Sequence, residues 1–221
     1  MARERGSWLV LWALGASLAG CWGNEPSAFP AGLEPLEDNP LPPLAGTADE
    51  PFPEGWALEG VDGPRHDTVY ARGYLAASPA AVWAAFRDPR VGVDRRSADE
   101  WEVEPLEDPA YDEAYVIHAT AYEIVRVDWS TTWRHGLVAG TPEAPELVAI
   151  RWQKTDGSTI LRLIEGSLVL RATADPAVTE LDLVYRVDAL ASGVSEYMRY
   201  VEDTLRDARA VVHGDPLPTF E

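Results

Sequence analysis

Hydrophobic and polar residues alternate with a period of two through most of the second half of the chain. Trp129, Trp133 and His135 fall on one face of a strand whose other face is polar, and the alternation recurs at residues 148–153 and 181–187. Successive side chains of a strand point to opposite faces of its sheet. The pattern therefore predicts a meander of strands in one antiparallel sheet, with no sign of alternating strands and helices.

One of these strands contains a glycine. Residues 160–172 are typical of a single long strand in which Gly166 marks a bulge or a bend. Glu165 has the same phase as Leu161 and Leu163, so its carboxylate is expected to face inward unless Gly166 rotates it outward.

Two segments follow the helical period instead. Ser78-Pro79 is a typical helix start, because serine caps the first turn and proline needs no hydrogen-bond partner there, and the sequence A-A-V-W-A-A-F follows. In residues 192–213 apolar positions recur at spacings of three and four, which predicts a helix ~33 Å long that ends at Gly214. Its apolar stripe must be buried, and the sheet is the partner that the chain offers.

The first twenty residues have the pattern of a secretory signal. Arg3 and Arg5 precede an apolar run over residues 8–18 that is too short to span a bilayer. The sequence Leu-Ala-Gly-Cys, ending at Cys21, resembles the lipobox of bacterial lipoproteins. This resemblance implies cleavage after residue 20 and acylation of Cys21, which would anchor the protein in a membrane. An ordinary signal peptide, or a core helix, with an incidental cysteine is the alternative.

The resemblance to lipoproteins also implies a location. Trp22 follows the cysteine, at the position where retention signals of the inner membrane often lie in that family. Because aspartate is absent there, we expect a lipid-anchored protein of the cell envelope on the periplasmic face of the outer membrane.

A region rich in proline and acidic residues comes next. Between Cys21 and Pro64 the chain has nine prolines, nine acidic residues and no apolar periodicity. Such a composition predicts an extended spacer over residues 21–64, although its last dozen residues could pack on the domain through Phe52 and Trp56. The folded domain is expected over residues 65–214, followed by a tail over 215–221.

Composition excludes several classes of protein. The net charge is -19 and Lys154 is the only lysine, which argues against nucleic-acid binding. One cysteine rules out a disulfide framework and multi-cysteine metal sites. The acidic residues 99–113 lack the spacing of a calcium loop and are better explained as a solvated hairpin. No phosphate-binding, dinucleotide or H-E-x-x-H motif is present, so no metal or cofactor is expected.

The order of elements resembles the START-like superfamily, which includes polyketide cyclases, START lipid-transfer domains and the Bet v 1 allergens. The resemblance covers residues 66–213: a strand at 68–77, the S-P-x-x-V-W-x-x-F helix, a meander with E-G-S-L-V-L, and the long C-terminal helix. It implies an α+β helix-grip fold, in which a curved antiparallel sheet of six to seven strands wraps around that helix, with one or two short helices after the first strand. It also implies an apolar cavity for sterols, phospholipids, quinones or polyketides, but no catalytic residue carries over.

Residues predicted to face this interior are the candidate ligand contacts. They are Trp129, Trp133, His135, Trp152, Tyr185, Tyr197, Met198 and Val201. Aromatic rings suit a bulky apolar ligand, yet they could equally fill a solid core.

Three hypotheses for the function follow. We expect a monomer that binds or carries a hydrophobic small molecule without chemistry. The alternatives are a cyclase-like or hydrolase-like enzyme, with His135 or Glu165 as its acid–base group, and a structural envelope module with a filled core.

Overall fold

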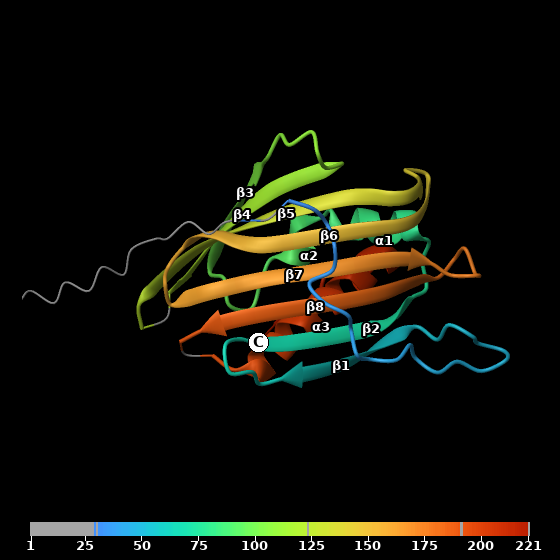
Figure 1. Ribbon diagram of the computed structural model, residues 1–221, viewed down its shortest axis with the longest axis horizontal. Coiled ribbons are helices and arrows are strands. Elements are labelled where there is room, and N and C mark those ends of the chain that lie inside the picture. The colour runs from blue at the N-terminus through green and yellow to red at the C-terminus, as the bar shows by residue number, and fades with distance from the viewer. Residues whose placement is uncertain (1–28, 30, 123, 191, 221) are drawn as a thin grey trace, which may run out of the picture.

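A single curved sheet is built from eight strands in the part of the chain that the structure describes. The computed structural model describes residues 29, 31–122, 124–190 and 192–220. The strand order is β1-β2-β8-β7-β6-β5-β4-β3, and each pair of neighbours is antiparallel (Figure 1). The strands are β1 (Gly55–Val61), β2 (Asp67–Leu75), β3 (Glu100–Pro105), β4 (Glu113–Tyr122), β5 (Arg126–Thr141), β6 (Ala144–Gly157), β7 (Leu161–Ala172) and β8 (Thr179–Ala189).

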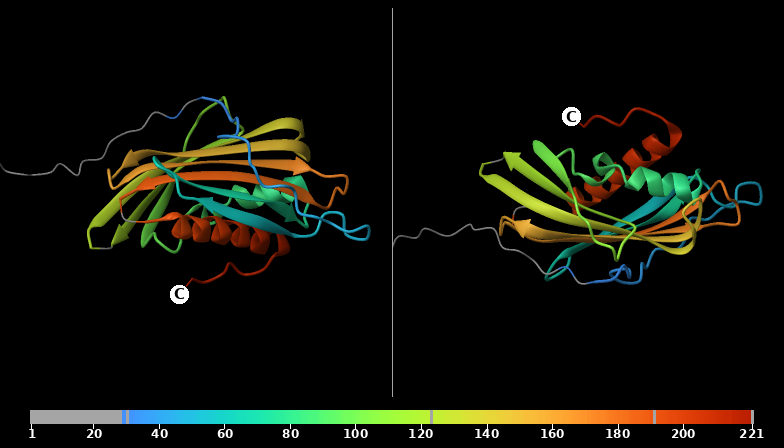
Figure 2. Two further views of the ribbon diagram at one scale, coloured as in Figure 1. Left: turned by 60° about the horizontal axis from the view of Figure 1, so that its bottom comes forward. Right: turned by 90° about the horizontal axis from the view of Figure 1, so that it is seen from above.

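The helices lie on the concave face of this sheet (Figure 2). They are α1 (Pro79–Phe86), α2 (Pro89–Gly92) and α3 (Val194–His213). Ser78 caps α1 by accepting a hydrogen bond from the N–H of Ala81, and α3 ends at Gly214, whose φ of 72° lies in the left-handed region. The α+β helix-grip arrangement is therefore confirmed, with eight strands in place of six to seven.

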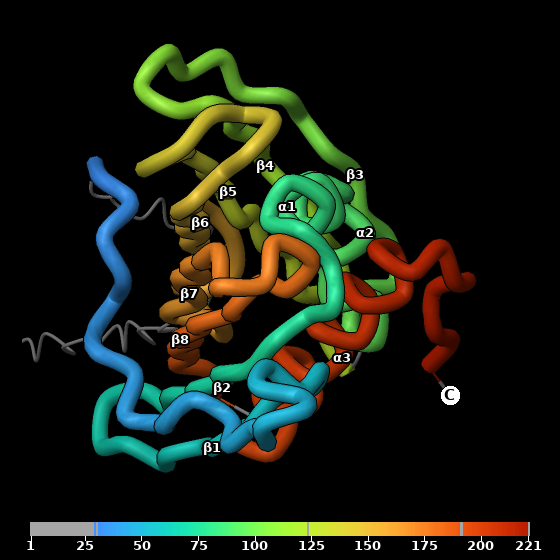
Figure 3. Tube along the Cα trace, turned by 90° about the vertical axis from the view of Figure 1, so that its right-hand side faces the viewer, coloured from blue at the N-terminus to red at the C-terminus, as the bar shows by residue number. Residues whose placement is uncertain are grey.

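The core lies between the sheet and the helices. Its fully buried residues include Leu75, Phe86, Leu168 and Leu205, which come from β2, α1, β7 and α3 in turn. Helix α3 packs mainly against β1 and β2, at one edge of the sheet. The strands toward the other edge are therefore covered mostly by α1, α2 and the segment that follows them (Figure 3).

The sheet starts earlier than the expected domain boundary at residue 65. Strand β1 lies within the predicted spacer, and it pairs with β2 from Gly55↔Tyr74 to Val61↔Thr68. Phe52 packs edge-on against Tyr74, so the alternative in which the last residues of the spacer join the domain is correct. The proline-rich pattern hid a strand because an edge strand buries only part of its surface.

The predicted extended spacer is also packed against the domain further upstream. Residues 31–44, here called the strap, cross the convex face of the sheet on the side opposite α3 (Figure 3). The Leu36 N–H donates to Ser167 Oγ (3.0 Å), and Asn39 Nδ2 donates to the carbonyls of Ala71 (3.0 Å) and Leu183 (3.3 Å). The strap thus contacts β7, β8 and β2 and does not extend freely away from the domain.

Charge holds the strap in place. The carboxylate of Glu37 accepts hydrogen bonds from the Tyr70 hydroxyl and from Arg186, which also pairs with Glu165 (3.3 Å). Burial raises the pKa of Glu37, but these hydrogen bonds outweigh it and leave that pKa below its usual value. Arg151 donates to the Glu34 carbonyl at 2.6 Å. Outward-facing arginines therefore hold the strap, Arg186 of β8 through the Glu37 carboxylate and Arg151 of β6 through a backbone carbonyl.

Glu165 points outward, contrary to the predicted phase. The register of β7 against β8 shifts between Leu161 and Leu163, so the inner face continues at Ile164 and Gly166. At Gly166 itself the register is continuous with both neighbouring strands, so the predicted bulge at this glycine is wrong. Gly166 instead leaves room for the indole ring of Trp152.

Neither a membrane-spanning helix nor a metal-binding cluster is found among the described residues. No helix there is long and apolar enough to cross a membrane. No group of three or more His, Cys, Asp or Glu side chains there could hold a metal ion. The acidic residues after position 99 form the hairpin of β3 and β4 that the sequence predicts.

Candidate functional site

An apolar cavity of about 620 Å³ lies between the inner face of the sheet and the N-terminal half of α3. Strands β4 to β8 form its floor, α3 forms one wall, and residues 92–97, here called the roof segment, close part of the top. Residues from each of these parts line it: Val93, Ile117, Ala119, Val127, Trp129, Trp133, Trp152, Leu161, Ile164, Tyr185, Tyr197 and Tyr200. Most of the lining is apolar or aromatic, while Arg96, Glu196 and Arg199 are exposed and lie at its rim.

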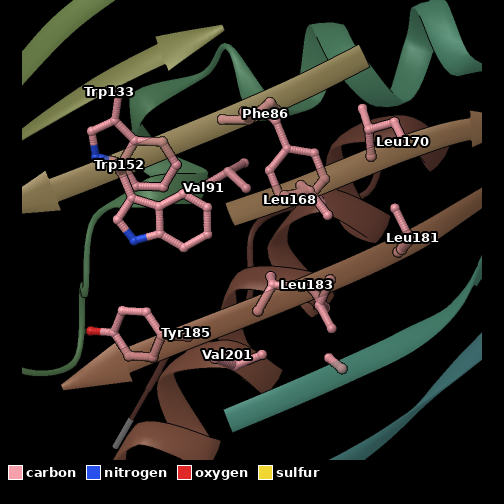
Figure 4. Close-up of a cluster of buried hydrophobic side chains, with 14 of the residues drawn as sticks. Phe86, Val91, Trp133, Trp152, Leu168, Leu170, Leu181, Leu183, Tyr185 and Val201 are labelled. Carbon is pink, nitrogen blue, oxygen red and sulfur yellow. The ribbon is translucent and has the colours of Figure 1, made fainter. Parts of the chain in front are cut away.

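A row of aromatic rings lines the inner side of the cavity. Figure 4 shows three of them, Trp133, Trp152 and Tyr185. The rings of Trp133 and Trp152 are stacked with centroids 4.5 Å apart, and Tyr185 follows 6.2 Å from Trp152. Tyr200 of α3 lies 4.9 Å from Tyr185, which extends the row from β5 across the sheet to the helix. The row gives a rigid apolar surface of the kind that suits a bulky ligand.

Gly166 makes this row possible. It pairs with Trp152 on β6, and a Cβ atom built on it would lie 2.0 Å from Cζ2 of that indole. The Trp152 ring therefore lies directly over the β7 backbone, where any side chain would displace it.

The roof segment is fastened to α3 by charged and polar groups. Arg95 pairs with Asp207 (2.6 Å) and Arg96 with Asp203 (2.9 Å). The Tyr200 hydroxyl donates to the Gly92 carbonyl at 2.8 Å. These contacts fix the distance between helix and roof, and so help to set the size of the cavity.

Five of the predicted ligand contacts line the cavity, namely Trp129, Trp133, Trp152, Tyr185 and Tyr197. The other three are absent from its lining. Val201 is buried in the core, and Met198 lies beside Gly60 of β1. His135 lies beyond Trp133, toward Tyr115. The sequence reasoning missed Tyr200 and the roof segment, since no local pattern indicates that residues 92–97 approach α3.

His135 is a neutral core residue. Its side chain is 0% exposed, and neither ring nitrogen has a hydrogen-bond partner among the described residues. Burial, with a smaller contribution from the charge of Arg87, lowers its pKa to about 3. The ring centroids of Tyr115 and Trp133 lie 5.6 and 6.4 Å away. An imidazole in this position cannot exchange protons with a molecule in the cavity.

Because His135 is buried in its neutral form, we expect the stability of the protein to depend on pH. Between its folded pKa of about 3 and its unfolded pKa of about 6.5, the unfolded chain binds a proton that the folded chain does not. Acidification from pH 7 to pH 5 should therefore remove about 2 kcal/mol of stability through His135. In His135→Phe, urea unfolding at the two pH values should show a loss smaller by that amount. Equal losses in both proteins would contradict the buried, neutral state.

Tyr185 and Tyr197 are titratable groups of the cavity wall. Burial raises the pKa of Tyr185 well above its usual value and also raises that of Tyr197, so both hydroxyls stay protonated at neutral pH. Glu165 lies on the outer face with Arg186. Neither of the acid–base candidates from the sequence reaches the cavity.

A second hollow of about 510 Å³ opens next to the apolar cavity. It lies between the β1–β2 turn and the start of α3, and shares Val187, Ser192 and Tyr197 with the first cavity. Its other residues are largely charged or polar, including Asp62, Arg65 and Asp67. This hollow is a polar, charged cleft at the surface, so the apolar cavity is the better candidate for a site that binds a hydrophobic ligand.

No protein-family model and no curated protein matches the chain. The solved structures similar to it include the human StarD13 lipid transfer and protein localization domain, with 10% identity and a TM-score of 0.46 over 73% of this chain and 88% of that one. The Zhui aromatase/cyclase from a Streptomyces species has 18% identity and a TM-score of 0.42, over 68% and 93% of the two chains. The protein TTHA0849 from Thermus thermophilus has 16% identity and a TM-score of 0.43, over 66% and 97%.

Proposed function

We propose that this chain is a lipid-anchored protein of the cell envelope whose domain binds a hydrophobic small molecule between the sheet and α3. The observation that supports binding is the cavity of about 620 Å³ with its row of aromatic rings. Its volume falls within the range of roughly 300–1,000 Å³ that is usual for small-molecule sites. A core filled for stability alone leaves few voids larger than a water molecule, so the cavity argues against the purely structural module.

Neither residue that the enzyme hypothesis proposed as an acid–base group lines the cavity. His135 is sealed in the core, and Glu165 pairs with Arg186 beneath the strap. The tyrosine hydroxyls at the cavity are held protonated by burial. Binding without chemistry is therefore the better proposal for this site.

Ligand binding should stabilise the protein. A ligand at one hundred times its dissociation constant adds about 2.7 kcal/mol to the free energy of unfolding. We expect at least one of palmitate, a sterol and a quinone to raise the melting temperature of the full chain by several degrees. Ala119 lines the cavity, so Ala119→Phe should weaken this shift strongly.

The matched control is Ala144→Phe, the same substitution at an exposed position at the start of β6. It should respond to the ligand as the unmodified chain does. Two results would count against the cavity as the site: no shift with any of the three compounds, or an unchanged shift in Ala119→Phe.

The anchor has a separate test. Cys21, which lies outside the described residues, is the only cysteine and ends the lipobox-like sequence. Cells fed with labelled palmitate should incorporate the label into the unmodified chain, and Cys21→Ser should reduce incorporation to background. Equal labelling of the two chains would refute acylation at this position.

A further inference from the structure

Exposed apolar side chains gather at one end of the sheet. Of the eight large hydrophobic residues that are clearly exposed in the described chain, six lie at or near this end: Val61, Trp101, Tyr122, Ile124, Val125 and Leu190. Figure 1 shows that the β4–β5 hairpin and the connection from β8 to α3 both lie at this end. Large hydrophobic groups gathered in this way on a protein with a net charge of -19 indicate a binding surface.

Two of these residues line the cavity, and a third lies beside it. Ile124 is 101% exposed and Val125 is 53% exposed, yet both belong to the lining of the cavity. Leu190, 57% exposed, donates its N–H to the carbonyl of Ile160, which also lines the cavity. We call Tyr122, Ile124, Val125 and Leu190 the apolar rim. The mouth of the cavity thus has an apolar side, which Ile124 and Val125 line, and a charged side with Arg96, Glu196 and Arg199.

The strap limits how far the domain can stand from an anchor at Cys21. Its hydrogen bonds and ion pairs hold residues 31–44 on the convex face, and the ring of Phe29 lies 4.0 Å from the guanidinium of Arg134 on β5. Phe29 follows Cys21 by only eight positions. Fully extended, this length of chain spans about 28 Å.

That reach matches the distance to the apolar rim. Arg134 and Arg126 are eight residues apart on β5, about 27 Å along the strand, and Arg126 begins the strand next to the rim. The opposite end of the sheet is also within reach, and both ends carry acidic residues: Glu143 and Asp175 lie in turns at that end, and Asp62 and Asp99 lie at the end with the rim. The apolar rim is what distinguishes its end, because exposed apolar side chains gain from contact with lipid.

From this arrangement we propose that the apolar rim docks on the lipid bilayer that carries the acylated Cys21, so that the cavity opens onto that bilayer. The inference rests on the proposed function for the anchor and the cavity. It adds where the ligand comes from: the domain exchanges an apolar molecule with its own membrane and does not carry it across a gap.

Docking can be measured with a fluorophore at the rim. In the acylated full chain the Cys21 thiol is blocked, so Ile124→Cys provides the single reactive thiol for an NBD-maleimide label. The matched control is Val138→Cys, which is 56% exposed on β5, away from the rim. Both proteins are reconstituted in vesicles of phosphatidylethanolamine and phosphatidylglycerol, with and without nitroxide-bearing lipid.

We expect the emission of the label at position 124 to shift to the blue and to be quenched several-fold by the nitroxide lipid. The label at position 138 should keep the emission wavelength of NBD in water and should not be quenched. Water-like emission at both positions overturns docking, even if ligands still raise the melting temperature. Insertion at 124 without any ligand-induced stabilisation supports docking and refutes the cavity proposal instead. Labelling of two thiols per chain would show that Cys21 is free and would remove the basis for the docking geometry.

Discussion

Replacing Arg95 by alanine is expected to lower the free energy of unfolding by about 3–5 kcal/mol, the usual effect of breaking a buried ion pair. Arg95 donates from Nε and Nη2 to the carboxylate of Asp207, whose side chain is 3% exposed. Burial raises the pKa of Asp207, although Arg95 acts in the opposite direction. Without Arg95, this carboxyl group would be left uncompensated in the interior.

Urea unfolding at pH 7, followed by circular dichroism, measures this loss. The control is Arg206→Ala, which removes an exposed pair with Glu202 one turn along α3 and should change stability by about 0.5 kcal/mol or less. Replacing both partners by apolar residues, in Arg95→Met with Asp207→Leu, should restore most of the stability. Equal effects of Arg95→Ala and Arg206→Ala would show that the roof segment does not depend on this pair.

Gly166→Ala is expected to destabilise the protein by about 3 kcal/mol, the upper part of the range for overpacking a core. The added Cβ would lie 2.0 Å from Cζ2 and 2.1 Å from Cε2 of Trp152, so the indole must move. Its stack with Trp133 would be lost, and the ring would be pushed toward the cavity. The substitution should therefore also weaken the stabilisation by ligand.

Unfolding monitored by tryptophan fluorescence reports both changes. Gly193→Ser is the matched control, because a Cβ at Gly193 meets nothing within 4 Å and serine suits its position as the cap of α3. This control should leave stability unchanged or slightly raised. If Gly166→Ala were as stable as the control, the contact between Trp152 and the β7 backbone would be wrong.

Local patterns in the sequence predict the elements that depend on local chemistry. The Ser78 cap, the stripe of α3 and the alternation in β5 each depend on residues a few positions apart, and each is confirmed. The inward direction of Trp133 and Trp152 follows from the same period of two. These features need no knowledge of distant contacts.

Features that depend on a partner strand could not be predicted in this way. The register shift between Leu161 and Leu163 exists only relative to β8, and it reverses the expected direction of Glu165. The role of Gly166 depends on the ring that lies over it from β6.

The strap is the clearest case of such a distant dependence. Leu36 bonds to a residue 131 positions away, and Asn39 to one 144 positions away. Its acidic, proline-rich composition is also that of a free spacer, so composition alone is misleading here. The cavity volume, in turn, depends on the placement of α3 against β1 and β2, which no local pattern encodes.

Photolabelling of the full chain with a diazirine-bearing C16 fatty acid tests most directly whether an apolar ligand occupies the cavity. After irradiation and digestion, we expect the label on peptides that carry Trp129, Trp152 or Tyr197, and we expect excess palmitate to remove it. Label spread over the outer face of the sheet, or label that excess palmitate leaves unchanged, would contradict binding in the cavity.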